Sequence, residues 1–259
     1  MNEQLPYNEP LIVNKTDQNV IEISELYKAF GKNNPILKGV NIQVKQGENL
    51  VVLGKSGSGK SVTIKCLVGL VAADKGAIKV FGTDITTLNE NELNKVRVRI
   101  GFLFQNAALY DSMTVRENLE FPLRRHVKNL SDEETEAAII ESLNSVGLSE
   151  AIDKMPSELS GGMRKRIGLA RTLILKPEII LYDEPTTGLD TITSREISEL
   201  ILAIQKKNKT SSIIITHDMA CAKLTADRII ILKDGVIDAE GSYEELEKSE
   251  DEWVRSFFI

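Results

Sequence analysis

Short, continuous apolar runs recur along this chain, and longer segments with a helical spacing of apolar positions separate many of them. The runs are rich in Val, Ile and Leu, as expected of strands that are buried on both faces of a sheet. Strands that alternate with helices form a mostly parallel sheet covered by helices, so the pattern predicts an α/β fold. The predicted strands are residues 20–23, 37–44, 49–53, 77–81, 100–104, 179–182, 212–216 and 229–232.

The four predicted strands before residue 82 follow one another through turns that contain glycine. This succession favours a small antiparallel sheet beside the main sheet. The glycines in question are Gly39, Gly47, Gly76 and Gly82.

The chain changes character after residue 105, where helical spacing replaces the strand pattern. Predicted helices begin at Thr114, at Ser131 and after Ser160, and Pro177 ends the last of them. They predict a helical subdomain inserted into the sheet domain. The expected organisation is a polar tail over residues 1–18, a main domain over 19–240 with the helical subdomain at about 106–176, and a C-terminal helical tail over 241–259.

Charge and composition narrow the class of partner. The net charge of −6 argues against direct binding to nucleic acid or to an anionic membrane surface. The longest apolar stretch, residues 66–73, is too short to cross a bilayer, and the N-terminal residues lack the pattern of a secretion signal. The two cysteines, Cys66 and Cys221, are far apart and are expected to be reduced and to serve in packing. We therefore expect no nucleic-acid partner, and membrane contact only through another protein.

The most specific chemical signal is the segment GKSGSGKS at residues 54–61, directly after the apolar run 49–53. This is a phosphate-binding loop between a buried strand and a helix. Its backbone N–H groups surround phosphate oxygens, Lys60 supplies a positive charge, and Ser61 offers a hydroxyl to Mg²⁺. The predicted nucleotide-binding residues here are Gly54, Lys55, Ser56, Gly57, Ser58, Gly59, Lys60 and Ser61.

Two later strands end in residues suited to hydrolysis. The run 179–182 leads into Asp183 and Glu184, which are placed to hold Mg²⁺ and to deprotonate a water molecule, respectively. The run 212–216 leads into His217, which we expect near the terminal phosphate. Taken alone, an acidic strand end or a surface histidine is common. Their position downstream of a phosphate loop favours the catalytic interpretation.

The segment Leu-Ser-Gly-Gly-Met at residues 159–163 opens the third predicted helix. Ser160 is a good N-cap, and Gly161 and Gly162 leave bare N–H groups at a positive helix end. A flexible loop is one interpretation. The other is a second phosphate-binding element, which reaches a nucleotide on another copy of the chain in a twofold, head-to-tail pair.

This ordered set of motifs resembles the nucleotide-binding subunit of an ABC transporter, over about residues 20–240. The resemblance implies a P-loop NTPase (RecA-like) core with an antiparallel β subdomain and an inserted α-helical subdomain. It implies ATP and Mg²⁺ as cofactors, with Gln105 joining Mg²⁺ and the attacking water to the helical subdomain. Asp190 corresponds to the loop that contacts the second copy. Phe30 falls where the family stacks an aromatic ring on adenine, with Tyr27 or a purely structural role as alternatives.

The resemblance also suggests a branch of the family. Met163 and Thr187 stand where Gln and Ser are usual, and the run Leu-Ser-Gly-Gly-Met-Arg-Lys-Arg is similar to ATPases of Mce-type lipid transport, the MlaF-like group. Residues 113–123 point the same way, whereas a solvated helix face is the alternative explanation of the basic run.

That branch implies phospholipid transport across the cell envelope. The implied partners are a second copy, integral membrane permease subunits and an Mce-type substrate-binding protein, at the cytoplasmic face of the inner membrane. Three alternatives stay open: the ATPase of another importer or exporter, a soluble non-transport ABC ATPase, and a nucleotide-binding module without hydrolysis.

Two apolar segments remain to be placed. Residues 102–123 include Phe104, Leu109, Tyr110 and Met113, which either line a groove for the membrane partner or fill the core of the helical subdomain. The apolar C-terminal segment 253–259 is expected to dock, either on its own subunit or on a second copy.

Overall fold

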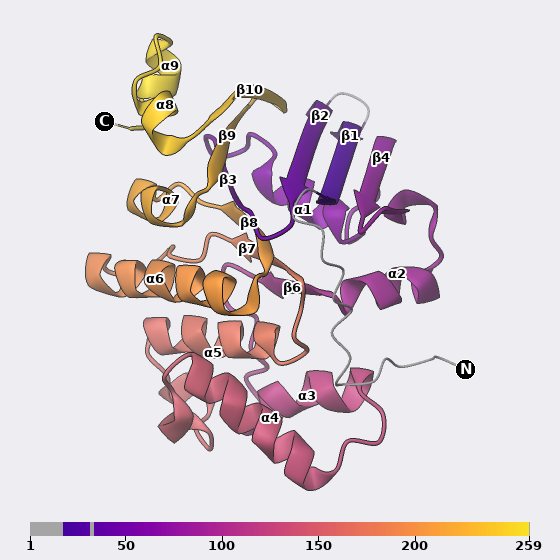
Figure 1. Ribbon diagram of the computed structural model, residues 1–259, viewed down its shortest axis with the longest axis vertical. Helices are drawn as coiled ribbons and strands as arrows, with labels where there is room; N and C mark the ends of the chain where they lie inside the picture. Colours follow the sequence, from indigo (N-terminus) through magenta and orange to yellow (C-terminus); the bar gives the residue numbers. More distant parts are fainter. Residues whose placement is uncertain (1–17, 32–33, 259) are drawn as a thin grey trace.

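The computed structural model describes residues 18–31 and 34–258, so the predicted N-terminal tail lies outside the described residues except for Gln18. The chain folds around two sheets with helices packed against them (Figure 1). The strands are β1 (Asn19–Ala29), β2 (Pro35–Lys45), β3 (Asn49–Leu53), β4 (Lys75–Val80), β5 (Thr83–Asp84), β6 (Ile100–Leu103), β7 (Ile179–Asp183), β8 (Ser211–Ile215), β9 (Arg228–Lys233) and β10 (Val236–Gly241). The helices are α1 (Lys60–Leu67), α2 (Glu90–Arg97), α3 (Val115–His126), α4 (Asp132–Ser145), α5 (Gly161–Leu173), α6 (Thr191–Asn208), α7 (Met219–Thr225), α8 (Tyr243–Glu247) and α9 (Glu252–Arg255).

The main sheet has six strands in the order β10-β9-β3-β8-β7-β6. The pairs from β9 to β6 are parallel, and β10 adds an antiparallel edge. Every residue of β3, β7 and β8 is buried, which explains why these strands read as continuous apolar runs rather than as alternating patterns. The predicted parallel core is confirmed.

The second sheet is antiparallel, with four strands in the order β2-β1-β4-β5. The prediction that residues 49–53 belong to this sheet is wrong. That segment is β3, which pairs in parallel with β8 and β9 at the centre of the main sheet. The long strand β1 is buried only in part, with exposed residues in its middle and half-buried ones at its end, so its apolar run indicates only its first residues.

Helices α3, α4 and α5 form the predicted helical subdomain, at the end of the molecule opposite α8 and α9 (Figure 1). A capping box begins α4 at Ser131, as the sequence predicts, and a second one, which was not predicted, begins α3 at Thr114. The buried side chains of Leu119 and Ile139 join one core cluster with residues of the main sheet, so the subdomain is not a separate globule. None of the helices in the described ranges combines the length and apolar character needed to cross a membrane.

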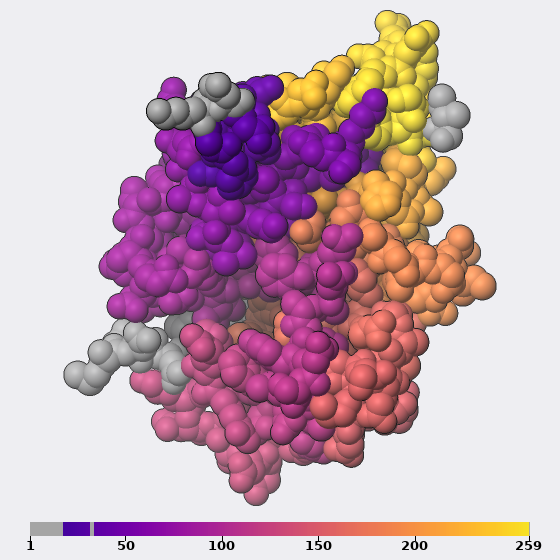
Figure 2. Space-filling view, turned by 180° about the vertical axis from the view of Figure 1, so that it is seen from behind, coloured from indigo at the N-terminus to yellow at the C-terminus, as the bar shows by residue number. Residues whose placement is uncertain are grey.

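The C-terminal tail packs on its own chain. Val254 is buried, the Trp253 and Phe257 rings meet edge to face, and Lys233 Nζ lies 4.0 Å from the centre of the Trp253 ring. Figure 2 shows the tail, in yellow, at the upper edge of the molecule, with the helical subdomain at the lower end. Docking on its own subunit is therefore one role of this segment, and contact with a second copy stays a prediction.

Candidate active site

The predicted phosphate-loop and hydrolytic residues come together at one edge of the main sheet. The phosphate loop follows β3, Gln105 follows β6, Glu184 follows β7 and His217 follows β8. These four strands run in parallel, so their carboxyl ends meet at the same edge. Sheet topology thus joins motifs that are up to 163 residues apart in sequence, from Gly54 to His217.

The phosphate loop is closed around Lys60. The Lys60 ammonium donates to the carbonyls of Gly54 at 2.7 Å and of Lys55 at 3.1 Å. Gly59 has a φ of +109°, which a residue with a side chain rarely adopts, and a Cβ there would lie 3.2 Å from the Ile36 carbonyl oxygen, so this position favours glycine. The buried hydroxyl of Ser58 has no hydrogen-bond partner among the described residues. A closed loop with a lysine and an unsatisfied buried hydroxyl fits the binding of phosphate.

Burial lowers the pKa of Lys60, and the carboxylates of Glu184 and Asp183 act in the opposite direction. Lys60 is only 8% exposed, so its ammonium has lost most of its hydration. Hydrogen bonds to the loop carbonyls and attraction to these carboxylates compensate for that loss. An anion bound beside Lys60 would further stabilise its charged form.

Of the three residues proposed as Mg²⁺ ligands, two lie close together and offer the oxygen atoms that Mg²⁺ favours. The Ser61 hydroxyl donates to Asp183 Oδ1 at 2.9 Å, which places a hydroxyl and a buried carboxylate side by side. Mg²⁺ favours such oxygen ligands and is usually completed by substrate phosphates and water, so no larger acidic cluster is required. Among the described residues no group of three His, Cys, Asp or Glu side chains forms a metal site of its own. Gln105 lies at the exposed surface, and its role as a ligand stays a prediction.

The carboxylate of Glu184 is held by two groups. His217 Nδ1 lies 2.7 Å from Glu184 Oε2, and the Thr187 hydroxyl donates to the same oxygen at 3.0 Å. Glu184 also has a φ of +53°, a strained conformation for a residue with a side chain. Its N–H donates to the Ile215 carbonyl at 2.9 Å, which ties this conformation to β8. An oriented carboxylate in this position can accept a proton from water.

Sequence reasoning brings Glu184 and His217 to the site but does not assign contacts to Thr187 or Lys165. The Lys165 ammonium donates to the carbonyls of Gln105 at 2.6 Å and of Glu184 at 3.0 Å. Burial lowers the pKa of Lys165 to about 8, against the effect of the Glu184 and Asp183 carboxylates. The solvated-face interpretation of the basic run is therefore wrong for Lys165. Lys165 faces the core because of its position on the helix, and this helical position is the sequence feature that could have indicated its burial.

The remaining predicted residues lie on the surface. Ser160 caps α5 by accepting from the Met163 N–H at 3.2 Å, and it is exposed together with Gly161, with Gly162 half-buried beside them. This geometry leaves the positive end of α5 accessible. Contact with a nucleotide on a second copy stays a prediction.

Asp190 and Phe30 occupy different surroundings. Asp190 caps α6 and accepts from the N–H groups of Ile192 and Thr193, both at 3.0 Å. Hydrogen bonds from Thr193 lower the pKa of Asp190. Phe30 is 50% exposed, which contradicts a role as a core aromatic, whereas Tyr27 is half-buried. Stacking of Phe30 on adenine stays a prediction.

The end of β6 and the segment after it present both half-buried and exposed aromatic groups. Phe102 and Phe104 stack with ring centres 4.1 Å apart, while Tyr110 is exposed and contacts the Phe121 ring. Asn118 fixes this segment by bonding the backbone N–H and carbonyl of Tyr110 at 2.8 and 3.1 Å. The segment 102–123 therefore contributes both to the packing of the chain and to its surface.

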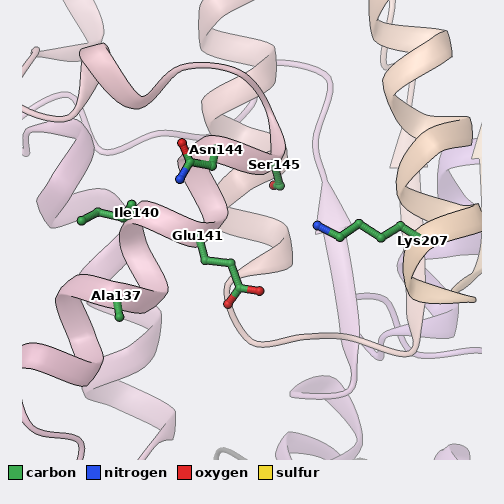
Figure 3. Close-up of a pocket in the computed structure, with 6 residues that line it drawn as sticks. All are labelled: Ala137, Ile140, Glu141, Asn144, Ser145 and Lys207. Atoms are coloured by element: carbon green, nitrogen blue, oxygen red, sulfur yellow. The ribbon is translucent and has the colours of Figure 1, made fainter.

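A pocket elsewhere on the molecule does not include the site. It lies between α4 and α6, and Figure 3 shows Lys207 extending toward the side chains of α4. Its lining contains none of the predicted site residues. The lining residues are Ala137, Ile140, Glu141, Asn144, Ser145 and Lys207.

Comparison with known proteins gives the family. The model of the ABC transporter family matches residues 37–187. The "Probable ribonucleotide transport ATP-binding protein mkl" of Mycobacterium leprae is 40% identical over 237 residues, which cover 92% of this chain and 68% of that protein. "Protein TRIGALACTOSYLDIACYLGLYCEROL 3, chloroplastic" of Arabidopsis thaliana is 38% identical over 255 residues, covering 92% of this chain and 73% of that protein. The methionine import protein MetN of Rhizobium johnstonii is 39% identical, covering 86% of this chain and 61% of that protein.

Solved structures agree with these sequence relatives. A dimeric ATP-binding cassette in a post-hydrolysis state, bound to ADP and Pi, superposes with a TM-score of 0.79 at 33% identity and covers 86% of this chain and 98% of its own. The cbiO1 protein of Clostridium perfringens, part of an ABC transporter complex, superposes with a TM-score of 0.82 at 28% identity and covers 93% and 94% of the two chains. The chain therefore belongs to the ABC transporter family, as an ATP-binding subunit that hydrolyses ATP.

Proposed function

We propose that two copies of this chain hydrolyse MgATP at shared sites and thereby drive phospholipid transport through membrane permease subunits. The observation that carries the catalytic part is the Glu184 carboxylate, held by His217 and Thr187 beside the Ser61–Asp183 pair. These groups combine a proton acceptor with oxygen ligands at the edge of the sheet that also bears the phosphate loop.

Each residue has a distinct task in this proposal. The phosphate loop and Lys60 bind the phosphates, and Ser61 and Asp183 hold Mg²⁺, which when bound neutralises charge on the phosphate oxygens. Glu184 accepts a proton from the attacking water, and His217 orients the carboxylate and the terminal phosphate. Gln105, at the start of the segment that leads to α3, links this chemistry to the helical subdomain.

A shared site explains the exposed end of α5. Ser160, Gly161 and Gly162 form a bare, positive helix terminus that is available for contact with the phosphates of a second copy. Asp190 lies in the loop before α6, and in this proposal it lies near the same interface between the two copies. The dimeric form of a cassette of similar fold, in structures at 32% and 33% identity, supports a pair of this kind.

Lipid cargo, which we take to be phospholipid, is supported by two observations. The run Leu-Ser-Gly-Gly-Met-Arg-Lys-Arg resembles the Mce-associated branch, and one relative carries the name of a glycerolipid. The implied partners are permease subunits and an Mce-type substrate-binding protein, at the cytoplasmic face of the inner membrane. A second candidate is import of a small solute, favoured by the methionine-import relative.

The Glu184→Gln variant tests the catalytic proposal. It should bind ATP with the affinity of the unmodified chain and accumulate as an ATP-bound dimer, because the amide cannot accept the proton. General-base assistance is worth about 10²- to 10⁴-fold, so we expect a loss of that order in kcat. Glu199→Gln, which alters an exposed carboxylate on α6, is the matched control. Turnover at the unmodified rate in Glu184→Gln would remove Glu184 from the mechanism.

Purification of the chain from membranes tests the cargo proposal. The copurifying membrane proteins and lipids are identified by mass spectrometry, and ATP hydrolysis by the complex is measured with phospholipid vesicles and with methionine. Retained phospholipid and an Mce-type subunit support the lipid branch. Stimulation by methionine, with a solute-type permease and no lipid, would favour the second candidate.

A further inference from the structure

Lys165 is a buried cation that the mechanism above does not use. It lies in the second turn of α5 and is only 5% exposed. A lysine usually keeps its ammonium in water, and a buried ammonium is tolerated only where hydrogen bonds compensate for the lost hydration. The acceptors of Lys165 therefore indicate what the residue is for.

Both acceptors are main-chain carbonyls of the active site. Lys165 Nζ bonds the Gln105 carbonyl oxygen at 2.6 Å and the Glu184 carbonyl oxygen at 3.0 Å. Gln105 follows β6 and Glu184 follows β7, and these strands are neighbours that pair Leu103 with Tyr182. One ammonium thus connects α5 to two adjacent loops at the carboxyl edge of the sheet.

The hydrogen bond from Lys165 to the Glu184 carbonyl holds a residue whose backbone is strained. Glu184 has a φ of +53°, which costs energy in a residue with a Cβ and persists only where the surroundings impose it. The Ile215 carbonyl accepts from the Glu184 N–H on one side, and Lys165 donates to the Glu184 carbonyl on the other. These two bonds determine how the residue is rotated, and hence where its carboxylate points toward His217.

The connection to α5 is rigid. Gly168, one turn after Lys165, packs so closely on the loop after β6 that a Cβ there would lie 2.7 Å from Ala107 Cβ. The same helix begins at Ser160, the residue expected to contact the nucleotide of a second copy. A displacement of α5 would therefore be transmitted directly to the main chain of Glu184 and Gln105.

We propose that Lys165 is a positioning residue for ATP hydrolysis, which ties the α5 helix to the backbone of Glu184 and thereby aims its carboxylate. This inference rests on the role proposed for Glu184. It predicts an effect on the chemical step and not on ATP binding, because Lys165 bonds to the backbone of the hydrolytic loops and not to the phosphate loop.

The Lys165→Met variant of the full chain tests the proposal, with Lys176→Met as the matched control. Lys176 is an exposed lysine just after the same helix. Lys165→Met removes two hydrogen bonds made by a charged group. We therefore expect kcat to fall by about 10- to 100-fold in Lys165→Met, while KM for ATP stays within about twofold of the unmodified value. The Lys176→Met control should retain kcat.

A double-mutant cycle with Glu184→Gln separates positioning from a general structural effect. If Lys165 acts through the Glu184 carboxylate, the two losses in single-turnover rate do not multiply, since the Glu184→Gln background has no carboxylate to aim. An equal factor in both backgrounds, an unchanged kcat in Lys165→Met, or an effect confined to KM would overturn the proposal. If Glu184→Gln alone is fully active, the role of Glu184 fails instead.

Thermal unfolding monitors the integrity of each variant. If Lys165→Met lacks a cooperative transition, the same cycle is run with Lys165→Gln, whose neutral amide is too short to bridge both carbonyls. The same non-multiplying loss in kcat is expected, and the same outcomes refute it.

Discussion

Substitution of Lys60 by methionine probes the phosphate loop through a single ammonium group. Methionine has a similar length and volume, so the variant removes the charge and the donors with little change in packing. In the structure two of the three ammonium protons bond the carbonyls of Gly54 and Lys55. A lysine has three donors, so one remains to meet a phosphate oxygen while the loop keeps its shape.

The expected loss follows from the surroundings of the ammonium. Two unit charges about 4 Å apart attract by about 4 kcal/mol at the effective dielectric constant of a site near the protein surface. Part of this is offset, because the phosphate gives up hydration when it binds beside the buried ammonium of Lys60. A net loss of about 3 kcal/mol corresponds to roughly a hundredfold rise in the Kd for ATP.

Titration calorimetry of MgATP binding measures this change, with Lys65→Met as the control on the same helix α1. The control should bind ATP with unchanged affinity, and both variants should keep a cooperative thermal transition. An unchanged Kd in Lys60→Met would refute the reasoning, because it would show that the ammonium does not interact with the bound phosphates.

Two further predictions concern stability. Leu119 is fully buried in α3, so Leu119→Ala should lower the free energy of unfolding by about 2–5 kcal/mol in urea titrations, with exposed Leu224→Ala as a near-neutral control. Burial, helped by Arg125, lowers the pKa of His126 from its ordinary 6.5, so the folded state favours the neutral imidazole. The stability that depends on neutral His126 is complete above pH 6.5 and is lost as the pH falls toward the lower folded pKa. His126→Gln should therefore flatten the fall in Tm below pH 6.5, and identical pH profiles of Tm would contradict this.

The local motifs of the site could be predicted because each lies within one segment of chain. The phosphate loop follows its own strand, and Asp183 and Glu184 end theirs, so composition and spacing were sufficient to identify them. The N-caps at Ser131 and Ser160 are likewise predictable from the sequence, because a cap bonds to backbone only a few residues away.

The pairing of strands could not be predicted from local sequence in the same way. The sequence alone predicts that β3 belongs to the antiparallel sheet, because its neighbours in sequence belong there. Its partners are β8 and β9, more than 150 residues later, and pairing over such separations depends on the fold as a whole.

The sequence by itself determined the class of fold and the phosphate-loop motif, and it singled out Glu184 as the candidate carboxylate for hydrolysis, since these depend on residue type and local spacing. Only the tertiary structure decided that Thr187 and His217 share one oxygen of Glu184, and that Lys165 is buried between two loops. The reason is geometric: a hydrogen bond forms within a few tenths of an ångström, and that precision arises only when strands and helices have packed.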